Sequence, residues 1–321
     1  MSLILRLVFF ALINLALVFT GFPVVKKKKI LLGWGMFVIS LLAVYLLFQY
    51  QNPVIKMLAI IATTFTAMKT IVVPMEYRDK PVKLNFKQWA AFSGGWVGMR
   101  AHPFETLGDN PLPGAGQMVR FGISRLIFGG LVIFAAREIA SLPLDTAYIH
   151  VIVSVLLLVG FSLILHFGLL SISAGMWWHA GANTYLLFRQ PAKATSLTEF
   201  WGKRWNLAFS EMTSIAIFRP LRGKMGHAAA LMLAFIFSGI LHELALSLPV
   251  NHGYGLPTLY FIIQGGLVLL EKVLKDKGGN FLQNKLVAHA WVFFWVVVPA
   301  PLLFHAEFIK QIIWPMAGLK F

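Results

Sequence analysis

The apolar residues of this chain fall into long, continuous runs rather than into alternating patterns. Runs of about 20 apolar residues match the roughly 30 Å of bilayer hydrocarbon, because a helix rises about 1.5 Å per residue. Every backbone N–H and C=O inside hydrocarbon needs a partner within the protein, so continuous runs favour helices over a barrel. The pattern predicts an all-α, polytopic transmembrane bundle of about eight spanning helices (seven to ten), at residues 2–22, 30–48, 54–73, 121–140, 147–172, 228–248, 257–271 and 286–305.

The composition of the chain supports a membrane location. Of the 321 residues, 58% are hydrophobic and 12% are charged, and the mean hydropathy is +0.76. Soluble domains carry about 25% charged residues, so this chain cannot supply the polar surface of a soluble fold. We find no internal repeat and no low-complexity tract, and we therefore expect one membrane-embedded domain over residues 1–321.

The basic residues are concentrated in every second connection between the predicted helices. Of the 28 Lys and Arg residues, 21 lie in four connections, at residues 23–29, 74–120, 173–227 and 272–285. The intervening connections hold no Lys or Arg, at residues 49–53, 141–146 and 249–256. Lys and Arg are retained on the cytoplasmic side during insertion, so the four basic connections are predicted to be cytoplasmic and both termini to face away from the cytoplasm.

The first apolar run could be a signal peptide, but four lysines, Lys26 to Lys29, stand where a small-residue cleavage site would lie. We therefore expect this helix to be retained. The net charge of +16 is not accompanied by an RNA-binding motif or a groove-reading helix, so no nucleic-acid partner is predicted. The chain has no cysteine, which excludes disulfides, thiolate catalysis and Cys-based metal sites.

Two of the predicted cytoplasmic segments, residues 74–120 and 173–227, are unusually long for a compact bundle. They are rich in Trp, Phe and Gly, which is unlike the composition of disordered chains. We expect them to form interfacial or re-entrant helices. Ser196 and Glu199 have the spacing of a capping box, which predicts a helix that begins there and runs toward Pro220.

That predicted helix carries one aromatic stripe, at Trp201, Trp205 and Phe209. One interpretation is an interfacial helix, because Trp prefers the headgroup depth and Lys203 and Arg204 would face water or lipid phosphate. Asn206 fits this interpretation poorly, since a carboxamide beside an apolar stripe needs hydrogen-bond partners. A specific polar role for Asn206 is the alternative.

His242 and Glu243 lie deep within the predicted helix 228–248. Counted from Ala228, His242 stands about 20 Å along the helix, past the midplane of the bilayer. Ionisable groups at this depth are rare and usually face a cavity, a partner or a pathway. The alternative is a neutral histidine that hydrogen-bonds to a neighbouring helix, with Glu243 protonated or paired. The other eight histidines show no metal-ligand spacing, so neither a metal nor a haem is predicted.

Two sequence motifs follow one another along these segments, about 35 residues apart. The first is Phe-Trp-Gly-Lys-Arg-Trp-Asn at residues 200–206, and the second is Ser-Gly-Ile-Leu-His-Glu-Leu at residues 238–244. Together they resemble the membrane-bound O-acyltransferase superfamily, and most closely its wax-synthase-like branch. The resemblance covers residues 195–245, with a weaker likeness at 95–99 and 103–104. Lys203 departs from the family pattern, because an arginine usually stands there.

The resemblance implies catalytic roles for two residues. The intramembrane histidine of the family is the general base, which carries over to His242. It would take the proton of an acceptor hydroxyl as the oxygen attacks a thioester carbonyl, so no nucleophilic Ser or Cys is needed. The family's Asn or His in the first motif carries over to Asn206, whose amide could orient the acceptor or hydrogen-bond the developing oxyanion.

Further residues of the two motifs are expected to bind substrate, namely Trp201, Lys203, Arg204, Trp205 and Glu243. The basic side chains could contact the phosphates of coenzyme A, together with Arg219, Arg222 and Lys224. Ordinary positive-inside charge is the alternative explanation for each of these cations.

These observations lead to the hypothesis of an acyl-CoA-dependent O-acyltransferase that acylates a hydrophobic alcohol within the membrane. Acyl-CoA is then a co-substrate, membrane lipid surrounds the site, and no cofactor is expected. The acceptor could be a fatty alcohol, a sterol, a hydroxylated metabolite or a glycan. The alternatives are an inactive relative and a transporter or lipid-binding protein, although transporters usually show paired repeats.

The expected location of such an enzyme is the bacterial inner membrane or the endoplasmic reticulum. The sequence does not determine the oligomeric state.

Overall fold

The computed structural model describes residues 1–143, 146–279 and 281–321, which form helices and connecting loops with no strand among them. The predicted loop 141–146 includes Leu144 and Asp145, and the predicted segment 272–285 includes Asn280; these three residues lie outside the described chain. Two compact units are present. Unit 1 comprises Met1–Ala101 and Phe188–His305, and unit 2 comprises His102–Leu187 and Ala306–Phe321. A single domain over residues 1–321 stays a prediction.

Eight helical stretches of the described chain are long and apolar enough to cross a membrane. They are Leu3–Lys26, Ile30–Phe48, Pro53–Glu76, Ala115–Ala140, Ala147–His179, His227–Val250, Leu256–Asp276 and Lys285–Leu303. Each coincides with one of the eight predicted runs, and the largest differences are at the start of the fourth and the end of the fifth. The predicted polytopic helical bundle is confirmed, and the chain is an integral, multi-pass membrane protein.

Unit 1 contains the first three and the last three of these spans, with short helices between them. Its elements are α1 (Leu3–Lys26), α2 (Ile30–Phe48), α3 (Pro53–Glu76), α4 (Phe86–Gly95), η3 (Pro191–Lys193), α8 (Leu197–Glu199), η4 (Phe200–Arg204), α9 (Leu207–Thr213), η5 (Ser214–Phe218), α10 (Arg219–Met225), α11 (His227–His242), η6 (Glu243–Ser247), α12 (Leu248–Val250), α13 (Leu256–Asp276), η7 (Phe281–Gln283), α14 (Lys285–Val297) and α15 (Ala300–Leu303).

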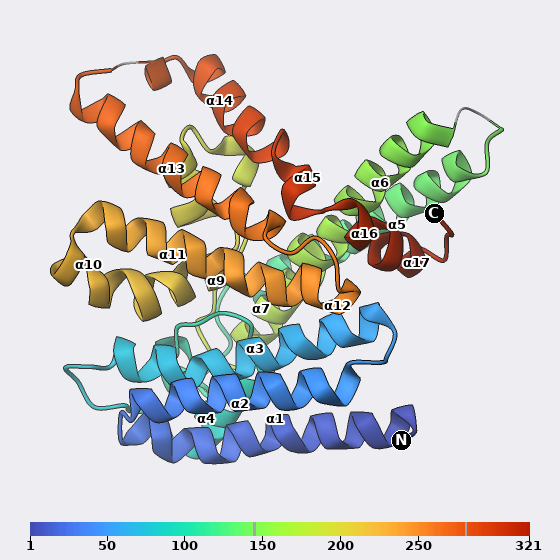
Figure 1. Ribbon diagram of the computed structural model, residues 1–321. Helices are drawn as coiled ribbons and strands as arrows, with labels where there is room; N and C mark the ends of the chain where they lie inside the picture. The colour runs from blue at the N-terminus through green and yellow to red at the C-terminus, as the bar shows by residue number, and fades with distance from the viewer. Residues whose placement is uncertain (144–145, 280) are drawn as a thin grey trace. The chain divides into compact units, whose positions relative to one another are not determined.

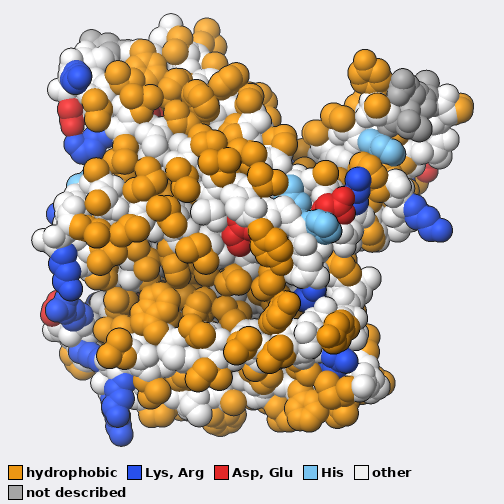
Figure 2. Space-filling view, viewed as in Figure 1, with side chains coloured by type: hydrophobic (Ala, Val, Ile, Leu, Met, Phe, Trp, Pro, Cys, Tyr) orange, Lys and Arg blue, Asp and Glu red, His pale blue; other side chains and the backbone are white. Residues whose placement is uncertain are grey.

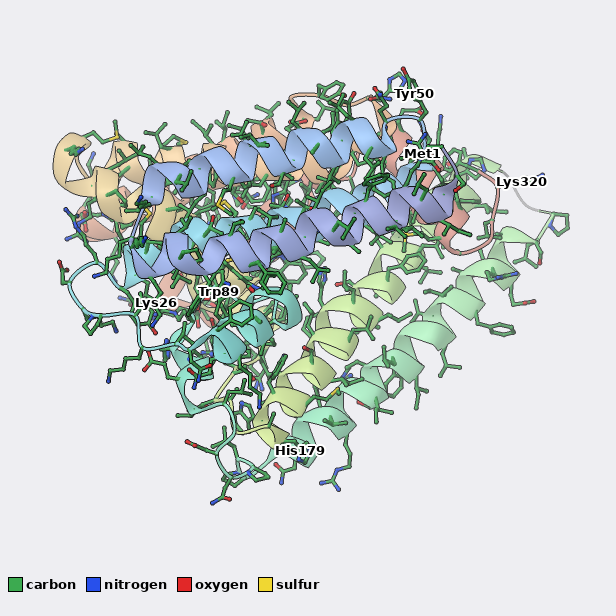
Figure 3. All side chains as sticks on the ribbon, turned by 90° about the horizontal axis from the view of Figure 1, so that it is seen from below. Met1, Lys26, Tyr50, Trp89, His179 and Lys320 are labelled. Carbon is green, nitrogen blue, oxygen red and sulfur yellow. The ribbon has the colours of Figure 1, made fainter. Side chains whose placement is uncertain are left out.

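Helices α1, α2 and α3 of unit 1 run side by side (Figure 1). Met1 and Tyr50 lie at one end of the α1–α2 pair and Lys26 lies at the other (Figure 3). At the Lys26 end, its ammonium donates to the Val82 carbonyl oxygen at 2.7 Å, which ties the loop before α4 to α1. Figure 2 shows Lys and Arg side chains at that end of unit 1 and mainly hydrophobic side chains along its flank, as expected for helices that span a membrane.

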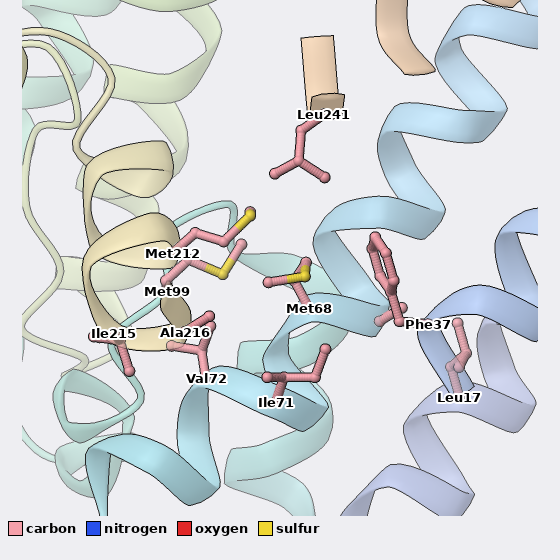
Figure 4. Packing of buried hydrophobic residues seen from close by; sticks show 11 residues of the cluster. Leu17, Phe37, Met68, Ile71, Val72, Met99, Met212, Ile215, Ala216 and Leu241 are labelled. Atoms are coloured by element: carbon pink, nitrogen blue, oxygen red, sulfur yellow. The ribbon is translucent and has the colours of Figure 1, made fainter. Parts of the chain in front are cut away.

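A hydrophobic core joins the N-terminal helices of unit 1 to the segment that carries the first motif (Figure 4). Phe37 of α2 and Met68 of α3 belong to it, as do Met212 of α9 and Leu241 of α11. Leu241 directly precedes His242 in the sequence. The core therefore holds one side of α11 against α2 and α3.

Two lysines of the spanning helix α3, Lys56 and Lys69, are almost fully enclosed. Lys69 of α3 is 1% exposed, and its ammonium donates to the carbonyl oxygens of Phe92 at 2.8 Å, Ser93 at 3.1 Å and Trp96. These carbonyls lie at the C-terminal end of α4, where a helix has no partners of its own for its last carbonyl groups. The sequence analysis did not single out Lys69, which caps α4 and fixes it against α3.

Unit 2 contains η1 (His102–Thr106), α5 (Ala115–Ala140), α6 (Thr146–Ser162), η2 (Leu163–Leu169), α7 (Leu170–His179), α16 (Ala306–Phe308), η8 (Ile309–Ile313) and α17 (Trp314–Met316). Helix α5 packs closely on the continuous stretch from α6 to α7. A Cβ atom on Gly129 would lie 2.7 Å from the Gly160 carbonyl oxygen, so glycine is needed where the two backbones approach. Trp314 donates to the Ser154 hydroxyl at 2.9 Å and anchors the C-terminal helices on α6.

Candidate active site

A cavity of about 1100 Å³ lies within unit 1, between α11, α13 and the segment of residues 195–218. Its lining is charged at one end, where Lys272, Lys275 and Asp276 stand at the C-terminal end of α13. His242 and Phe261 line it farther along. From Lys275 to Phe261 the helix rises about 20 Å, so the cavity is several helical turns long. Aromatic and aliphatic side chains cover most of the surface between these ends.

His242 is the last residue of α11 and lines this cavity. Its Nδ1 lies 2.7 Å from the Ser238 carbonyl oxygen. A carbonyl oxygen only accepts, so Nδ1 carries the proton and donates it in this bond. In the neutral ring the other nitrogen, Nε2, is then an unprotonated acceptor. No described residue hydrogen-bonds to Nε2.

Two phenylalanine rings hold the His242 imidazole in place. The Phe209 centroid lies 4.7 Å from the imidazole centroid and the Phe261 centroid lies 4.4 Å from it, with interplanar angles of 47° and 39°. Phe209 belongs to α9 and Phe261 to α13. The orientation of His242 therefore depends on the packing of three separate elements. All three rings line the cavity.

Gly239 and Glu243 of the second motif attach α11 to α13. A Cβ atom on Gly239 would lie 2.7 Å from the Thr258 Cα atom, so only glycine permits this approach. Glu243 Oε1 accepts from the backbone N–H groups of Gly255 and Thr258 at 2.9 and 3.0 Å, and from the Thr258 hydroxyl at 2.9 Å. Glu243 thus caps the N-terminus of α13 and does not line the cavity. Its substrate-binding role stays a prediction, while its observed contacts fix the N-terminal end of α13.

The helix predicted from Ser196 toward Pro220 begins where expected but is not continuous. The Ser196 hydroxyl accepts from the Glu199 N–H at 3.0 Å, as an N-cap residue does. The helix then changes to a π-helical turn, η4, and stops at Trp205. Asn206 has a φ of +42°, in the left-handed region that interrupts a right-handed helix. The prediction of one uninterrupted helix was wrong because an asparagine tolerates this backbone conformation.

Despite the break, the three aromatic residues of the predicted stripe lie on one cavity, since Trp201, Trp205 and Phe209 all line it. Trp205 stacks on Phe200, with ring centroids 5.6 Å apart and 12° between the planes. Trp201 donates its indole N–H to the Gln264 side-chain oxygen at 3.0 Å. These contacts fix two of the indole rings on the wall of the cavity.

Asn206 lines the cavity and is the N-cap residue of α9. Its side-chain oxygen accepts from the Phe209 N–H at 3.4 Å. The side-chain nitrogen makes no hydrogen bond to any described residue. Asn206 and His242 therefore each present an unused polar atom on the same cavity, one a donor and the other an acceptor.

Lys203 and Arg204, the predicted phosphate contacts, differ in their surroundings. Lys203 is exposed and does not line the cavity. Arg204 pairs with Glu199, with an N–O distance of 2.7 Å. Partial burial opposes the charge on Glu199, but hydrogen bonds from Thr195 and the Arg204 guanidinium outweigh it and hold the pKa of Glu199 below its ordinary value of 4.5. Phosphate binding by Lys203 and Arg204 stays a prediction.

Several residues that line or support the cavity were missed by the sequence analysis. Lys272 and Lys275 line its charged end, and the Lys275 ammonium makes no hydrogen bond or ion pair with any described residue. Gln264 is fully buried and binds Trp201, and Glu271 is 5% exposed and lines the cavity. A signal was present, because Gln264 and Glu271 are polar residues inside a predicted spanning run. Among the described residues no group of His, Asp and Glu has the arrangement of a metal site.

Comparison with known proteins places the two motifs within one family match. Residues 184–263 match the membrane bound O-acyl transferase family. A long-chain-alcohol O-fatty-acyltransferase of Simmondsia chinensis is 25% identical over 277 residues, which cover 81% of this chain and 68% of that relative. A probable long-chain-alcohol O-fatty-acyltransferase of Arabidopsis thaliana is 26% identical over 249 residues, 72% of this chain and 68% of the relative. An acyl-CoA–sterol O-acyltransferase of the same plant is 30% identical over 130 residues, 38% of each chain. The resemblance inferred from the motifs is confirmed.

Proposed function

We propose that this chain is an acyltransferase of the membrane-bound O-acyltransferase family and that it transfers an acyl group from coenzyme A to the hydroxyl of a lipid-like alcohol. The observation that carries this proposal is the hydrogen bond of the His242 ring to the Ser238 carbonyl oxygen. Its Nδ1 donates to the Ser238 carbonyl oxygen at 2.7 Å, which leaves Nε2 as a proton acceptor on an otherwise largely apolar cavity. A general base needs this arrangement, with one nitrogen oriented and the other free.

The proposed reaction needs only groups that line the cavity. His242 Nε2 accepts the proton of the alcohol as its oxygen attacks the thioester carbonyl. The carbonyl oxygen becomes an oxyanion, to which the Asn206 side-chain N–H donates a hydrogen bond. The C–S bond then breaks, and the departing thiolate takes the proton from His242. The products are an ester and free coenzyme A, and the histidine returns to its starting state.

The charged end of the cavity suits the donor. Coenzyme A is a large polyanion made in the cytoplasm, and only its acyl end has to reach His242. Lys272 and Lys275 stand at the end of α13 that the distribution of basic residues assigns to the cytoplasm. Lys272 pairs with Asp276 at 2.6 Å, so Lys275 is the ammonium more readily available for a phosphate oxygen.

The apolar lining suits a hydrophobic acceptor. Leu231, Phe235 and Val268 line the wall, and no described carboxylate other than Glu271 and Asp276 does so. A long hydrocarbon chain gains favourable burial on such a surface, at about 25 cal/mol per Å². The names of the relatives from both plants are those of enzymes acting on long-chain alcohols or sterols. We propose a long-chain fatty alcohol as the acceptor, with a sterol as the second substrate to assay.

The test is an acyl-transfer assay with purified protein, palmitoyl-CoA and hexadecanol, in which the wax ester is measured by mass spectrometry. The wild-type protein should form the ester. His242→Gln keeps a polar side chain of similar size but has no proton acceptor at neutral pH, so its rate should fall by about 10² to 10⁴. Binding of a non-reactive acyl-CoA thioether should be retained, because the substitution does not alter the charged end of the cavity.

The matched control is His179→Gln, an exposed histidine at the end of α7 in unit 2. It should transfer at the wild-type rate. Loss of a general base should leave about a hundredth of the wild-type rate or less. A folded His242→Gln protein that kept more than about a tenth of that rate would therefore overturn the catalytic assignment. Absence of any acyl transfer by the wild type to alcohols or sterols would favour a transporter or lipid-binding protein.

A further inference from the structure

Glu271, near the C-terminal end of α13, is a buried carboxylate with four hydrogen-bond donors. Oε1 accepts from the Leu197 N–H at 2.7 Å and from the Trp291 indole at 2.9 Å. Oε2 accepts from the N–H and the hydroxyl of Thr198, each at 3.0 Å. The side chain is 5% exposed. Buried charge is costly unless it is fully hydrogen-bonded, and here both oxygens are occupied.

Two of these donors are the first free backbone amides of the helical stretch that carries the first motif. A helix leaves its first N–H groups without partners inside the helix. Ser196 takes the Glu199 N–H, and Glu271 takes those of Leu197 and Thr198. The negative charge also lies at the positive end of the helix dipole. Glu271 therefore fixes where the stretch 197–204 begins.

The same face of α13 also contacts Trp201 of the first motif and His242. Gln264 lies two helical turns before Glu271 and accepts the Trp201 indole N–H at 3.0 Å. One further turn away, Phe261 lies with its ring centroid 4.4 Å from that of His242. A single rigid helix therefore carries the contacts to the first motif and the contact to the proposed base. The distance between Asn206 and His242 depends on how α13 is joined to each.

We propose that Glu271 is a positioning residue for acyl transfer, which aligns the segment holding Asn206 with His242. This inference rests on the proposed function. Glu271 need not touch the reacting atoms, since it acts through the backbone of residues 197 and 198. Misplacement of a reacting group by about 1 Å can lower a rate 100-fold, so loss of this anchor should appear mainly in kcat.

The test uses purified full-length protein in the assay above, with kcat, both KM values and thermal midpoints measured. Glu271→Gln keeps the shape but replaces one acceptor oxygen with an NH₂ group, which would face either the Leu197 or the Thr198 amide. We expect kcat per folded molecule to fall about 30- to 100-fold. Each KM should change less than about threefold, because uniform binding contacts are retained. Glu271→Asp keeps the charge with a shorter reach and should recover part of the rate.

A double-mutant cycle separates positioning from a purely structural role. The Asn206→Asp background lacks the free amide donor. In this background Glu271→Gln should lower kcat by less than about threefold further, because the effects of substituting two residues that act together do not multiply in full. If the two effects multiplied in full, Glu271 would not act through Asn206 and the inference would be overturned. The same holds if folded Glu271→Gln protein kept the wild-type kcat.

Two further variants keep the test decisive. Should Glu271→Gln fail to fold, Trp291→Phe is the second variant. It removes one of the four hydrogen-bond donors to Glu271 but keeps an aromatic ring, and Trp291 does not line the cavity. It should lower kcat about three- to tenfold with unchanged KM values, and a wild-type kcat would overturn the inference. Glu138→Gln, on an exposed face of α5, is the matched control and should have no effect. Inactivity of the wild type would instead contradict the proposed function.

Discussion

The side-chain oxygen of Asn206 accepts the backbone N–H of Phe209 at 3.4 Å, and Asn206 itself has a left-handed φ of +42°. This one residue therefore ends the first motif and begins α9. It also sets the direction of Phe209, whose ring centroid lies 4.7 Å from that of His242. The side-chain nitrogen is left for a ligand, so the capping and the proposed catalytic contact use different atoms.

Because the two roles use different atoms, substitutions at Asn206 should separate them. Asn206→Asp keeps the capping oxygen and tolerates the left-handed backbone, but it has no N–H donor. Its kcat should fall about 10² to 10³, as when a single oxyanion donor is lost. Asn206→Gly, which adds no charge, should lose a similar amount. Asn251 also has a left-handed φ, of +54°, so Asn251→Asp is the control. Retention of more than a third of the wild-type kcat by Asn206→Gly would exclude the donor role.

The charged end of the cavity predicts a binding effect without a catalytic one. Lys275→Glu should raise the KM for acyl-CoA about tenfold, because a charge-assisted hydrogen bond of roughly 1.5 kcal/mol is lost and repulsion is added. The kcat should stay nearly constant. The difference should shrink at high salt, since these charges are exposed. Lys277→Glu, a neighbouring lysine that does not line the cavity, should leave the KM unchanged. Equal effects of the two substitutions would argue against a specific phosphate contact.

The lowered pKa of Glu199 predicts pH-dependent stability. A carboxylate with a folded-state pKa below 4.5 contributes stability above that pH and loses the contribution as the pH falls through the folded value. Glu199→Gln should therefore lower the free energy of unfolding by about 1 kcal/mol at pH 7. At pH 4 and below the difference from wild type should shrink. Thermal unfolding in detergent at several pH values measures both. A difference that is constant with pH would show that the charge on Glu199 is not responsible.

The distribution of basic residues predicts the orientation in the membrane. The native chain has no cysteine, so a single introduced thiol can be labelled without background. His252 lies in a predicted outer loop and is exposed, and it is a better site than Asn251, whose left-handed backbone would strain a cysteine. A membrane-impermeant maleimide added to intact cells should label His252→Cys and should not label Lys224→Cys. The opposite pattern would reverse the orientation.

The eight spanning helices were predictable from the sequence because the physical cause is local. A continuous apolar run must form a helix in hydrocarbon, whatever its neighbours do. The two motifs were also recognisable, since residue types at fixed spacing identify them. His242 stood out for a similar reason, as an ionisable residue in an apolar run is rare.

Contacts between distant parts of the chain were decided by the tertiary structure alone. Local signals predicted an unbroken helix from Ser196, because they do not report the left-handed backbone at Asn206. Glu271 and the Leu197 amide are 74 positions apart, and no local pattern indicates that one caps the other. No local pattern indicates either that Glu243, next to His242, caps the N-terminus of α13. Hydrogen bonding of buried polar groups depends on which elements pack together, and only the folded chain determines that.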